Sequence, residues 1–449
     1  MKLNVIGGGL AGCEAAWQAA ELGVEVALHE MRPILSTGAH RTGKLAELVC
    51  SNSLGSDLPN RASGLLKAEL RQLRSLLIDC ADASAIPAGG ALAVDRELFS
   101  DCVEDKLASH PKIAILRQEI QAIPLSPAIL ATGPLTSQNL SEKLLTFTDH
   151  EHLFFYDAIA PVIEYDSINL EVTFRADRYD YDKINEGDYI NCPFDKESYH
   201  EFLKALIQAE RIPRHTFESE IDGGVDAGTE AYFQRCQPIE VLAQKGERAL
   251  LFGPMRPVGL IDPRTGRRPY AVVQLRQDTL AGDLYNLVGF QTNLTHAEQA
   301  RVFRMIPGLE SVKFQRFGQM HRNTYLAAPK LLDNTLAFHK QPGLFVAGQL
   351  AGTEGYAGNI ASGLVAGINA AHYLLGKPPL QLPVTTMTGA LIHYITHADT
   401  KSFQPMKAMF GLLPEPGQTQ RLKKIERHKY YAERALTELN NYIIRHLSA

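Results

Sequence analysis

Residues 3–30 read "LNVIGGGLAGCEAAWQAAELGVEVALHE", and this stretch decides the fold of the sequence around it. Residues 3–6 are mostly apolar, residues 13–23 are rich in alanine, and residues 24–30 are rich in valine. This pattern predicts a strand, a glycine turn, a helix and a second strand, which together make a βαβ unit. A βαβ unit holds its two strands parallel in one sheet. We therefore expect an α/β chain that begins with a Rossmann-type domain.

The glycine turn has the spacing G-x-G-x-x-G, with Gly7, Gly9 and Gly12 at its fixed positions. The first glycine permits the tight turn, the second lets the backbone approach a pyrophosphate, and the third lets the helix pack closely on the sheet. The helix N-terminus then offers unpaired N–H groups to the phosphates. We expect these residues of the turn to contact a dinucleotide: Gly7, Gly8, Gly9, Leu10, Ala11 and Gly12.

An acidic residue ends the second predicted strand. Glu30 follows Gly7 by 23 residues, at a place where a carboxylate can accept hydrogen bonds from both hydroxyls of an adenosine ribose. A carboxylate there also disfavours a ribose 2′-phosphate. Arg32 lies two residues further on and joins the expected cofactor site.

Two later segments favour FAD over NAD. "ATGP" at 131–134 and "FVAGQ" at 345–349 each combine the end of a predicted strand with glycine. Both can therefore contact an extended cofactor that lies along the carboxyl edge of the sheet. The expected contacts here are Thr132, Gly133, Gly348, Gln349 and Gly358. The sequence has no second G-x-G-x-x-G, so a nicotinamide cofactor would have to reach the flavin without a Rossmann domain of its own.

The character of the sequence changes along the chain and predicts three parts. Residues 136–327 contain strands with aromatic and alternating polar residues, interleaved with helices, which indicates an inserted α+β domain with a mainly antiparallel sheet. Residues 1–135 and 328–385 form the predicted FAD-binding domain. Residues 386–449 form a helical C-terminal segment that packs on it.

Two stretches show clear helical patterns. Leucines recur at helical spacing over residues 64–79, "GLLKAELRQLRSLLID", and predict one amphipathic helix. A charged amphipathic pattern from about residue 417 to 446 predicts a helix in the tail.

Composition limits the class of protein. The 449 residues are 45% hydrophobic and 21% charged, which argues against wholesale disorder. The net charge of −5 gives no overall attraction to a polyanion, so an RNA partner would need a local basic face. No apolar run reaches the roughly 18 residues of a membrane span. The six cysteines form no C-x-x-C pair, so we expect a cytoplasmic protein without metal, disulfide framework or membrane contact.

Cys50 lies in "ELVCSNSLGSD", residues 47–57, which gives a thiol little apolar cover. A cysteine in the cytosol is most often a small buried hydrophobic residue. Here the neighbours carry hydroxyl and amide groups, and Arg41 and Lys44 upstream favour a thiolate. We therefore interpret Cys50 as a reactive thiol. We interpret these cysteines as structural: Cys13, Cys80, Cys102 and Cys192.

Nine segments carry a resemblance to a known family. They are "GGGLAGCEAAW", "EMRP", "LAELVCSNSLGSD", "PAGGALAVDR", "CQPIEVLA", "GPMRPVGLIDPRTGRRPYAVVQLRQD", "MHRNTYL", "GYAGNIASGLVAGINAA" and "FQPMKAMFGLLP". Together they resemble the folate- and FAD-dependent tRNA (uracil-5-)-methyltransferases, in the glucose-inhibited-division-like group of flavoproteins. The related flavoproteins that modify the wobble uridine share the FAD motifs but have a long extra C-terminal region. A small-molecule flavin oxidoreductase is the third alternative.

The resemblance implies a reaction at C5 of the T-loop uridine at position 54 of tRNA. A methylene group would come from 5,10-methylenetetrahydrofolate, and FAD reduced by NADPH or NADH would complete the methyl group. One thiol would add to C6 of the base and another group would remove the C5 proton. By resemblance Cys50 is the nucleophile and Cys236 removes the proton, although the two roles could be reversed.

The resemblance also implies substrate contacts. His321 would stack on the pterin, with Arg322 and Asn323 making polar contacts, whereas a lone histidine without the family would be a hydrogen-bonded structural residue. Tyr356 and Asn359 would line the folate pocket.

Two basic stretches could contact RNA phosphates. Residues 255–276 and residues 421–435 each carry a net charge of +4 in an acidic chain. We expect Arg264, Arg267 and Arg268 to bind tRNA. The alternative for each stretch is an ordinary solvated surface.

Overall fold

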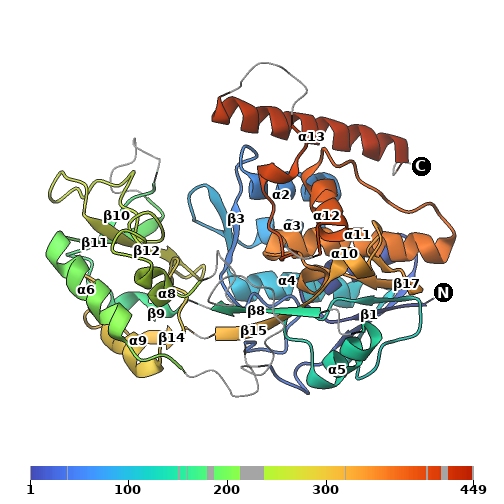
Figure 1. The fold of residues 1–449 in the computed structure, drawn as a ribbon, viewed down its shortest axis with the longest axis horizontal. Helices are drawn as coiled ribbons and strands as arrows, with labels where there is room; N and C mark the ends of the chain where they lie inside the picture. Colours follow the sequence, from blue (N-terminus) through green and yellow to red (C-terminus); the bar gives the residue numbers. More distant parts are fainter. Residues whose placement is uncertain are drawn as a thin grey trace.

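The computed structural model describes residues 2–37, 39–149, 152–158, 160–178, 187–212, 237–318, 320–400, 403–415 and 423–446. None of the helices within these ranges combines the length and apolar character that crossing a bilayer requires. Two lobes built on separate sheets stand beside each other, and a long C-terminal helix lies across the top of one of them (Figure 1).

The first lobe is built on a six-stranded sheet in the order β16-β17-β7-β1-β2-β6. The strands are β1 (Lys2–Ile6), β2 (Glu25–Glu30), β6 (Ile113–Arg117), β7 (Ala128–Leu130), β16 (Ala337–Phe338) and β17 (Gln341–Val346). All neighbours are parallel except the edge pair β16 and β17. The predicted βαβ unit is confirmed, and the predicted strand ends at 131 and 347 follow β7, which pairs with β1, and β17, which pairs with β7.

Helices α1 (Leu10–Glu21) and α11 (Tyr356–Leu375) pack closely against each other on this sheet. A Cβ placed at Gly363 would lie 2.3 Å from the carbonyl oxygen of Ala11, and one at Gly367 would lie 2.5 Å from that of Ala15. Only glycine allows this approach, so the small residues of α11 bring its N-terminus to the same edge as the G-x-G-x-x-G turn.

The single helix expected over residues 64–79 is wrong. Two helices occupy this part of the chain, α2 (Ala62–Gln72) and α3 (Leu76–Ala83). Arg74 between them has a left-handed backbone conformation, with φ of 57°, which a continuous helix cannot contain. Ser75 then caps α3 by accepting a hydrogen bond from the N–H of Ile78 at 3.3 Å. The leucine spacing continues across this break and does not reveal it.

The second lobe contains a six-stranded sheet in the order β10-β11-β12-β13-β9-β14, and all of its pairs are antiparallel. The strands are β9 (Val162–Glu164), β10 (Phe174–Arg175), β11 (Tyr189–Phe194), β12 (Ala271–Gln277), β13 (Leu284–Leu287) and β14 (Phe314–Arg316). Helices α6 (Lys196–Gln208), α8 (Ile239–Gln244) and α9 (His296–Phe303) share its core. The expected α+β lobe with an antiparallel sheet is confirmed, while the domain boundaries given above stay a prediction.

Smaller elements join and complete the lobes. The antiparallel pair β8 (His152–Ala158) and β15 (Met320–Leu326) lies between them (Figure 1). A small sheet of β3 (Ser53–Ser56), β5 (Ala91–Val94) and β4 (Ala85–Ile86) follows the Cys50 segment. The remaining helices are α4 (Arg96–Ser109), α5 (Gln138–Phe147), α10 (Ala328–Leu331) and α12 (Met387–His397), with 3-10 turns at Tyr165–Ser167, Gly348–Ala351 and Phe410–Leu412.

The C-terminal helix α13 (Lys424–His446) packs on α2. Its buried face consists of Tyr431, Ala432, Ala435 and Leu439. The tail therefore covers the first lobe with one face and leaves the opposite face exposed. The first residues of the predicted tail helix, 417–422, lie outside the described part of the chain.

Candidate functional site

One cavity lies at the carboxyl edge of the first sheet, where β1, β2, β6, β7 and β17 end. Its walls include these expected cofactor residues: Gly7, Gly9, Leu10, Ala11, Glu30, Arg32, Thr132, Gly133, Gly348 and Gln349. Segments from five parts of the sequence are thus brought to one site. Tyr356 and Asn359 line the same cavity. Most of the residues expected to bind FAD and two of those expected to bind the folate, Tyr356 and Asn359, therefore line the same cavity.

The glycine turn leaves free space on the side that faces the cavity. Gly7 has φ of 106°, and a Cβ at Gly12 would lie 1.8 Å from the carbonyl oxygen of Gly7. A Cβ at Gly9 would meet nothing within 4 Å. The first and third glycines are therefore required by the fold, whereas Gly9 keeps open the place where a pyrophosphate would lie against the helix N-terminus. Gly358 faces Leu391 and is not part of the cavity wall.

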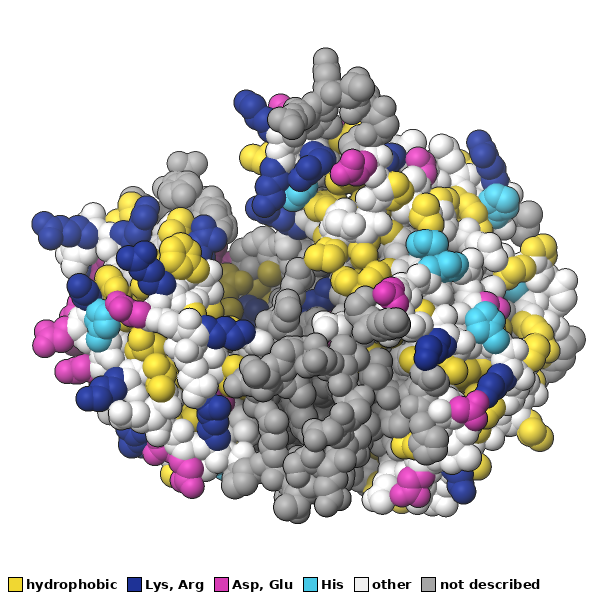
Figure 2. Space-filling model, in the orientation of Figure 1, with side chains coloured by type: hydrophobic (Ala, Val, Ile, Leu, Met, Phe, Trp, Pro, Cys, Tyr) yellow, Lys and Arg dark blue, Asp and Glu magenta, His cyan; other side chains and the backbone are white. Residues whose placement is uncertain are grey.

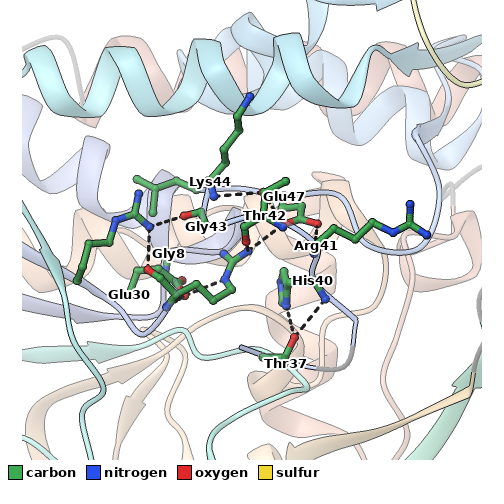
Figure 3. Close-up of polar contacts among 12 residues, drawn as sticks. Gly8, Glu30, Thr37, His40, Arg41, Thr42, Gly43, Lys44 and Glu47 are labelled. Carbon is green, nitrogen blue, oxygen red and sulfur yellow. Dashed lines mark hydrogen bonds and ion pairs between the residues drawn. The ribbon is translucent and has the colours of Figure 1, made fainter. Parts of the chain in front are cut away.

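Glu30 is buried at the end of β2 and is held by its neighbours (Figure 3). Its Oε2 accepts a hydrogen bond from the N–H of Gly8 at 2.8 Å, and its Oε1 accepts two from Arg32 at 2.9 Å. Burial raises the pKa of Glu30, but the hydrogen bonds and charge of Arg32 outweigh it and hold that pKa below its ordinary value. Glu30 is therefore ionised and retains acceptor capacity for a ribose hydroxyl.

A second carboxylate orders the loop that follows β2. Glu47 accepts hydrogen bonds from the N–H groups of Arg41 at 2.8 Å and Thr42 at 3.1 Å (Figure 3). Its Oε2 also pairs with Arg32 at 3.0 Å. The sequence reasoning missed Glu47, together with other cavity residues: His29, Met31, His40, Val49 and Gln118. They carry no glycine pattern, and only their position next to strand ends could have indicated them.

Cys50 lies directly beside this cavity. The hydroxyl oxygen of Tyr356, at the start of α11, accepts hydrogen bonds from the N–H of Cys50 at 2.9 Å and from that of Ser51 at 3.0 Å. Burial raises the pKa of Tyr356, so its hydroxyl is neutral. The adjacent Val49 is itself part of the cavity wall. The loop is thus attached to the same helix that helps to close the expected cofactor site.

Most of the cations near Cys50 are not the ones that its sequence neighbours suggested. Lys44 pairs with Asp101 at 2.7 Å, and the Arg41 side chain is exposed, although its charge acts on Arg316. Arg96 and Arg316 instead contact the backbone of the Cys50 loop. Arg96 stood inside a segment of family resemblance, but nothing in the sequence connected Arg316 with Cys50, because the contact joins two lobes.

The expected RNA-binding arginines have different environments. Arg264 is held by Asp262 at 2.7 Å, whereas Arg267 and Arg268 are exposed and form no ion pair within the described residues. Arg276 contributes to the net charge of +4 given above for residues 255–276, but its side chain is only 7% exposed. It contacts the Cys50 loop rather than solvent, so counting it as part of a basic surface was wrong.

Lys and Arg side chains nonetheless gather on both sides of a hollow between the second lobe and α13 (Figure 2). Burial and the neighbouring charges of Lys424 and Arg427 lower the pKa of His428 in the first turns of α13. Two separate basic surfaces therefore face one hollow.

Four expected site residues have side chains that lie outside the described part of the structure. Cys236 lies outside the described residues. His321, Arg322 and Asn323 belong to β15, for which the backbone pairing with β8 is described. Across the ranges that the structure does describe, no group of His, Cys, Asp and Glu side chains is arranged to bind a metal ion.

Comparisons with known proteins agree with this architecture. The family model for glucose inhibited division protein A matches residues 2–378. The solved structure of Aquifex aeolicus GidA in its form I crystal superposes with a TM-score of 0.70 at 18% identity, covering 98% of this chain and 75% of that one. At this identity the likeness shows the fold alone.

Curated relatives match over nearly their whole length. The methylenetetrahydrofolate–tRNA-(uracil-5-)-methyltransferase TrmFO of Anoxybacillus flavithermus is 51% identical, with 99% of each chain covered. The protein of the same name from Synechococcus sp. (strain JA-3-3Ab) is 54% identical, with 97% of this chain and 94% of that one covered. The chain therefore belongs to the glucose inhibited division protein A family and, within it, to the family of methylenetetrahydrofolate–tRNA-(uracil-5-)-methyltransferases.

Proposed function

We propose that this protein is an FAD-dependent enzyme that transfers the methylene group of 5,10-methylenetetrahydrofolate to C5 of uridine 54 in the T-arm of tRNA. NADPH or NADH supplies the electrons. The observation that carries the proposal is the attachment of the Cys50 loop to Tyr356 at the wall of the cavity. It puts a thiol beside a site suited to an extended dinucleotide. The names of the relatives support the folate and the tRNA substrate.

The residues of the cavity suit FAD. The open side of Gly9 leaves space for the pyrophosphate, and the ionised Glu30 can accept a ribose hydroxyl. Thr132, Gly133 and Gln349 follow the neighbouring strands and extend the site along the sheet. The flavin, when bound, supplies the hydride that completes the methyl group. His321, Arg322, Asn323, Tyr356 and Asn359 would hold the pterin.

The chemistry requires two groups because C5 of uracil is a poor nucleophile. A thiolate adds to C6, a sulfur–carbon bond forms, and the electron pair of the C5=C6 bond moves towards C5 and O4. C5 then attacks the methylene carbon as the bond between that carbon and one folate nitrogen breaks, and a base removes the C5 proton. The bond to the second folate nitrogen breaks and releases tetrahydrofolate, and the thiolate leaves C6 once the methylene carbon has been reduced. We assign these two steps to Cys50 and Cys236. A transcript with 5-fluorouridine at position 54 distinguishes their roles, because fluorine at C5 blocks proton removal and leaves the attacking cysteine attached to the RNA.

The exposed arginines and α13 suit binding of the RNA backbone. Arg267 and Arg268 have no acidic partner among the described residues, and they can exchange counterions for phosphates. Lys424 and Arg427 supply positive charge at the start of α13. The target base must leave the stack of the T-loop to expose C5 and C6.

One assay tests the function. The purified flavoprotein is incubated with NADPH, an unmodified T-arm transcript and methylenetetrahydrofolate that carries a labelled methylene group. We expect the label in 5-methyluridine at position 54. Label that comes only from S-adenosylmethionine, or that enters the anticodon loop, would contradict the proposal. NADPH oxidation without any RNA product would instead indicate a small-molecule flavin oxidoreductase.

A further inference from the structure

Two arginines bind three consecutive carbonyl groups of the Cys50 loop. The Nη1 of Arg96 donates to the carbonyl oxygen of Leu48 at 2.5 Å. The Nη1 of Arg316 donates to that of Val49 at 3.2 Å, and its Nη2 donates to that of Cys50 at 3.4 Å. Arg96 begins α4 of the first lobe, while Arg316 ends β14 of the second. The backbone of the thiol is therefore held from both lobes.

The two arginines differ in their charge partners. Arg96 forms a two-pronged ion pair with Asp278, at 3.0 Å and 3.1 Å. Arg316 has no ion pair within the described residues, and its buried Nε has no hydrogen-bond partner there. A buried guanidinium without a counter-ion is costly unless an anion lies near it. Arg316 is therefore a cation left without an ion pair beside Cys50, as is Arg276, whose hydrogen bonds go to the neutral side chains of Asn52 and Ser51. Of these two, Arg316 is the one that binds the carbonyl group of Cys50 itself.

The surrounding groups leave a positive excess. The charged and titratable side chains about the loop are Arg41 before it, Arg96 from α4, Arg276 from β12, Asp278 just after β12, Arg316 from β14 and Tyr356 from α11. Arg276 donates to the Oγ of Ser51 at 2.8 Å and is thus part of the same set. Four cations, of which Arg41 is exposed, face one carboxylate and a neutral phenol, so an anion at Cys50 is electrostatically favoured.

We propose that Arg316 is a positioning residue that keeps Cys50 in its thiolate form at neutral pH while it fixes the loop backbone. This inference rests on the proposed function, because a thiolate is needed both to attack C6 and to take up the C5 proton. Arg96 also binds the loop backbone, but its ion pair with Asp278 offsets most of the charge of Arg96. The uncompensated charge of Arg316 sets the ionisation of the thiol.

The electrostatics of Arg316 agree with this role. Burial and then the charge of Arg96 lower the pKa of Arg316 to about 10, against the opposing effects of Asp278 and Cys50. Arg316 is thus still charged at pH 7. Because the interaction between two titrating groups is reciprocal, the cation that gains from an anionic Cys50 also favours that anion.

The test measures how fast Cys50 is alkylated as pH changes. The flavin-loaded protein is treated with iodoacetamide from about pH 5 to about pH 10, a range that includes the ordinary thiol pKa. The thiolate displaces iodide and forms a sulfur–carbon bond, and mass spectrometry of the Cys50 peptide gives the rate. In Arg316→Met we expect the midpoint to rise by about one pH unit. Arg316→Lys keeps the charge and should keep the midpoint near that of the wild type.

Two further variants sharpen the result. Arg301 is half exposed on α9 and paired with Glu298, so Arg301→Met should leave the profile unchanged. Asp278→Asn removes the carboxylate that neutralises Arg96 and should move the midpoint down, which keeps the proposal testable if Arg316→Met does not fold. A midpoint that stays in place in Arg316→Met, with normal flavin content and melting temperature, would overturn it. An alkylation midpoint that stays in place in Asp278→Asn would also overturn the proposal.

Alkylation requires no methyl transfer. A wild-type protein that alkylates as expected but makes no 5-methyluridine would count against the proposed function and not against the role of Arg316.

Discussion

Tyr356 and Cys50 are 306 residues apart in the sequence, yet the Tyr356 hydroxyl accepts the backbone hydrogen bond of Cys50 at 2.9 Å. The same oxygen accepts a second bond from the N–H of Ser51 at 3.0 Å. Helix α11 therefore joins two features that the sequence presents separately, the cavity for a dinucleotide and the loop with a polar thiol. One phenolic oxygen thus accepts two backbone hydrogen bonds of the loop that carries the thiol.

Tyr356→Phe should uncouple the loop from the cavity. The change leaves two partly buried backbone N–H groups without their acceptor, at a cost of up to about 1–3 kcal/mol each if they stay unpaired. We expect normal flavin content and a methyl-transfer rate reduced by about tenfold or more, measured from single-turnover product formation. The matched control is Tyr373→Phe, because Tyr373 is 51% exposed. An unchanged rate in Tyr356→Phe would show that this contact does not position Cys50.

Gly9→Leu should give a folded protein that lacks flavin. No atom lies within 4 Å of a Cβ at this position, so the side chain can enter the cavity without disturbing the fold. It would then occupy the space assigned to the pyrophosphate. Gly12→Ala should instead fail to fold, because its Cβ would lie 1.8 Å from a backbone oxygen. Flavin absorbance and circular dichroism separate the two outcomes, and a fully yellow Gly9→Leu protein would count against the assignment.

Arg267→Ala and Arg268→Ala should weaken tRNA binding through electrostatics. Each loses one phosphate contact, so the slope of the logarithm of affinity against the logarithm of salt concentration should fall by about one. Flavin content should not change, because both side chains lie on the surface. Arg301→Ala serves as the control for a surface arginine with an acidic partner. Filter binding at several salt concentrations measures the slope, and equal slopes in all variants would exclude this surface from the RNA interface.

Glu69 should make stability depend on pH. It is buried and accepts bonds from the N–H groups of Met387 and Thr388, and burial still raises its pKa to about 7. The folded protein therefore keeps a proton that the unfolded chain loses near its ordinary pKa of 4.5. The contribution of Glu69 to stability is thus greatest below about pH 4.5 and decreases as pH rises to about 7.

Glu69→Gln removes this titration with little change in shape. The melting temperature of the wild type relative to Glu69→Gln should fall as pH rises through this window, as scanning fluorimetry can measure. A constant difference between the two proteins would mean that folding does not raise the pKa of Glu69.

Local pattern predicted the parts of the site that one segment determines. The glycine spacing from Gly7 to Gly12, the acid at Glu30 and the strand ends before Thr132 and Gly348 were all readable, because a βαβ unit places them by short-range geometry. The split between α2 and α3 was not, because a single left-handed residue, Arg74, interrupts a leucine pattern that otherwise continues.

Contacts between the lobes could not be read from one sequence. Arg316 and Arg276 reach the Cys50 loop from strands more than 200 residues away, and no spacing rule connects them with it. The sequence neighbours Arg41 and Lys44 suggested the right kind of charge, but Lys44 pairs with Asp101 and the arginines that bind the loop backbone come from elsewhere in the chain. Nearness in sequence does not identify the cations that surround the thiol, because the tertiary fold brings most of them from distant parts of the chain.

The most direct test of the account is methyl transfer by Cys50→Ala in a flavin-loaded preparation. With labelled methylenetetrahydrofolate, NADPH and an unmodified T-arm transcript, the account predicts no labelled 5-methyluridine from Cys50→Ala and normal product from a Cys102→Ala control, at equal flavin content. Wild-type product formation by Cys50→Ala would contradict it.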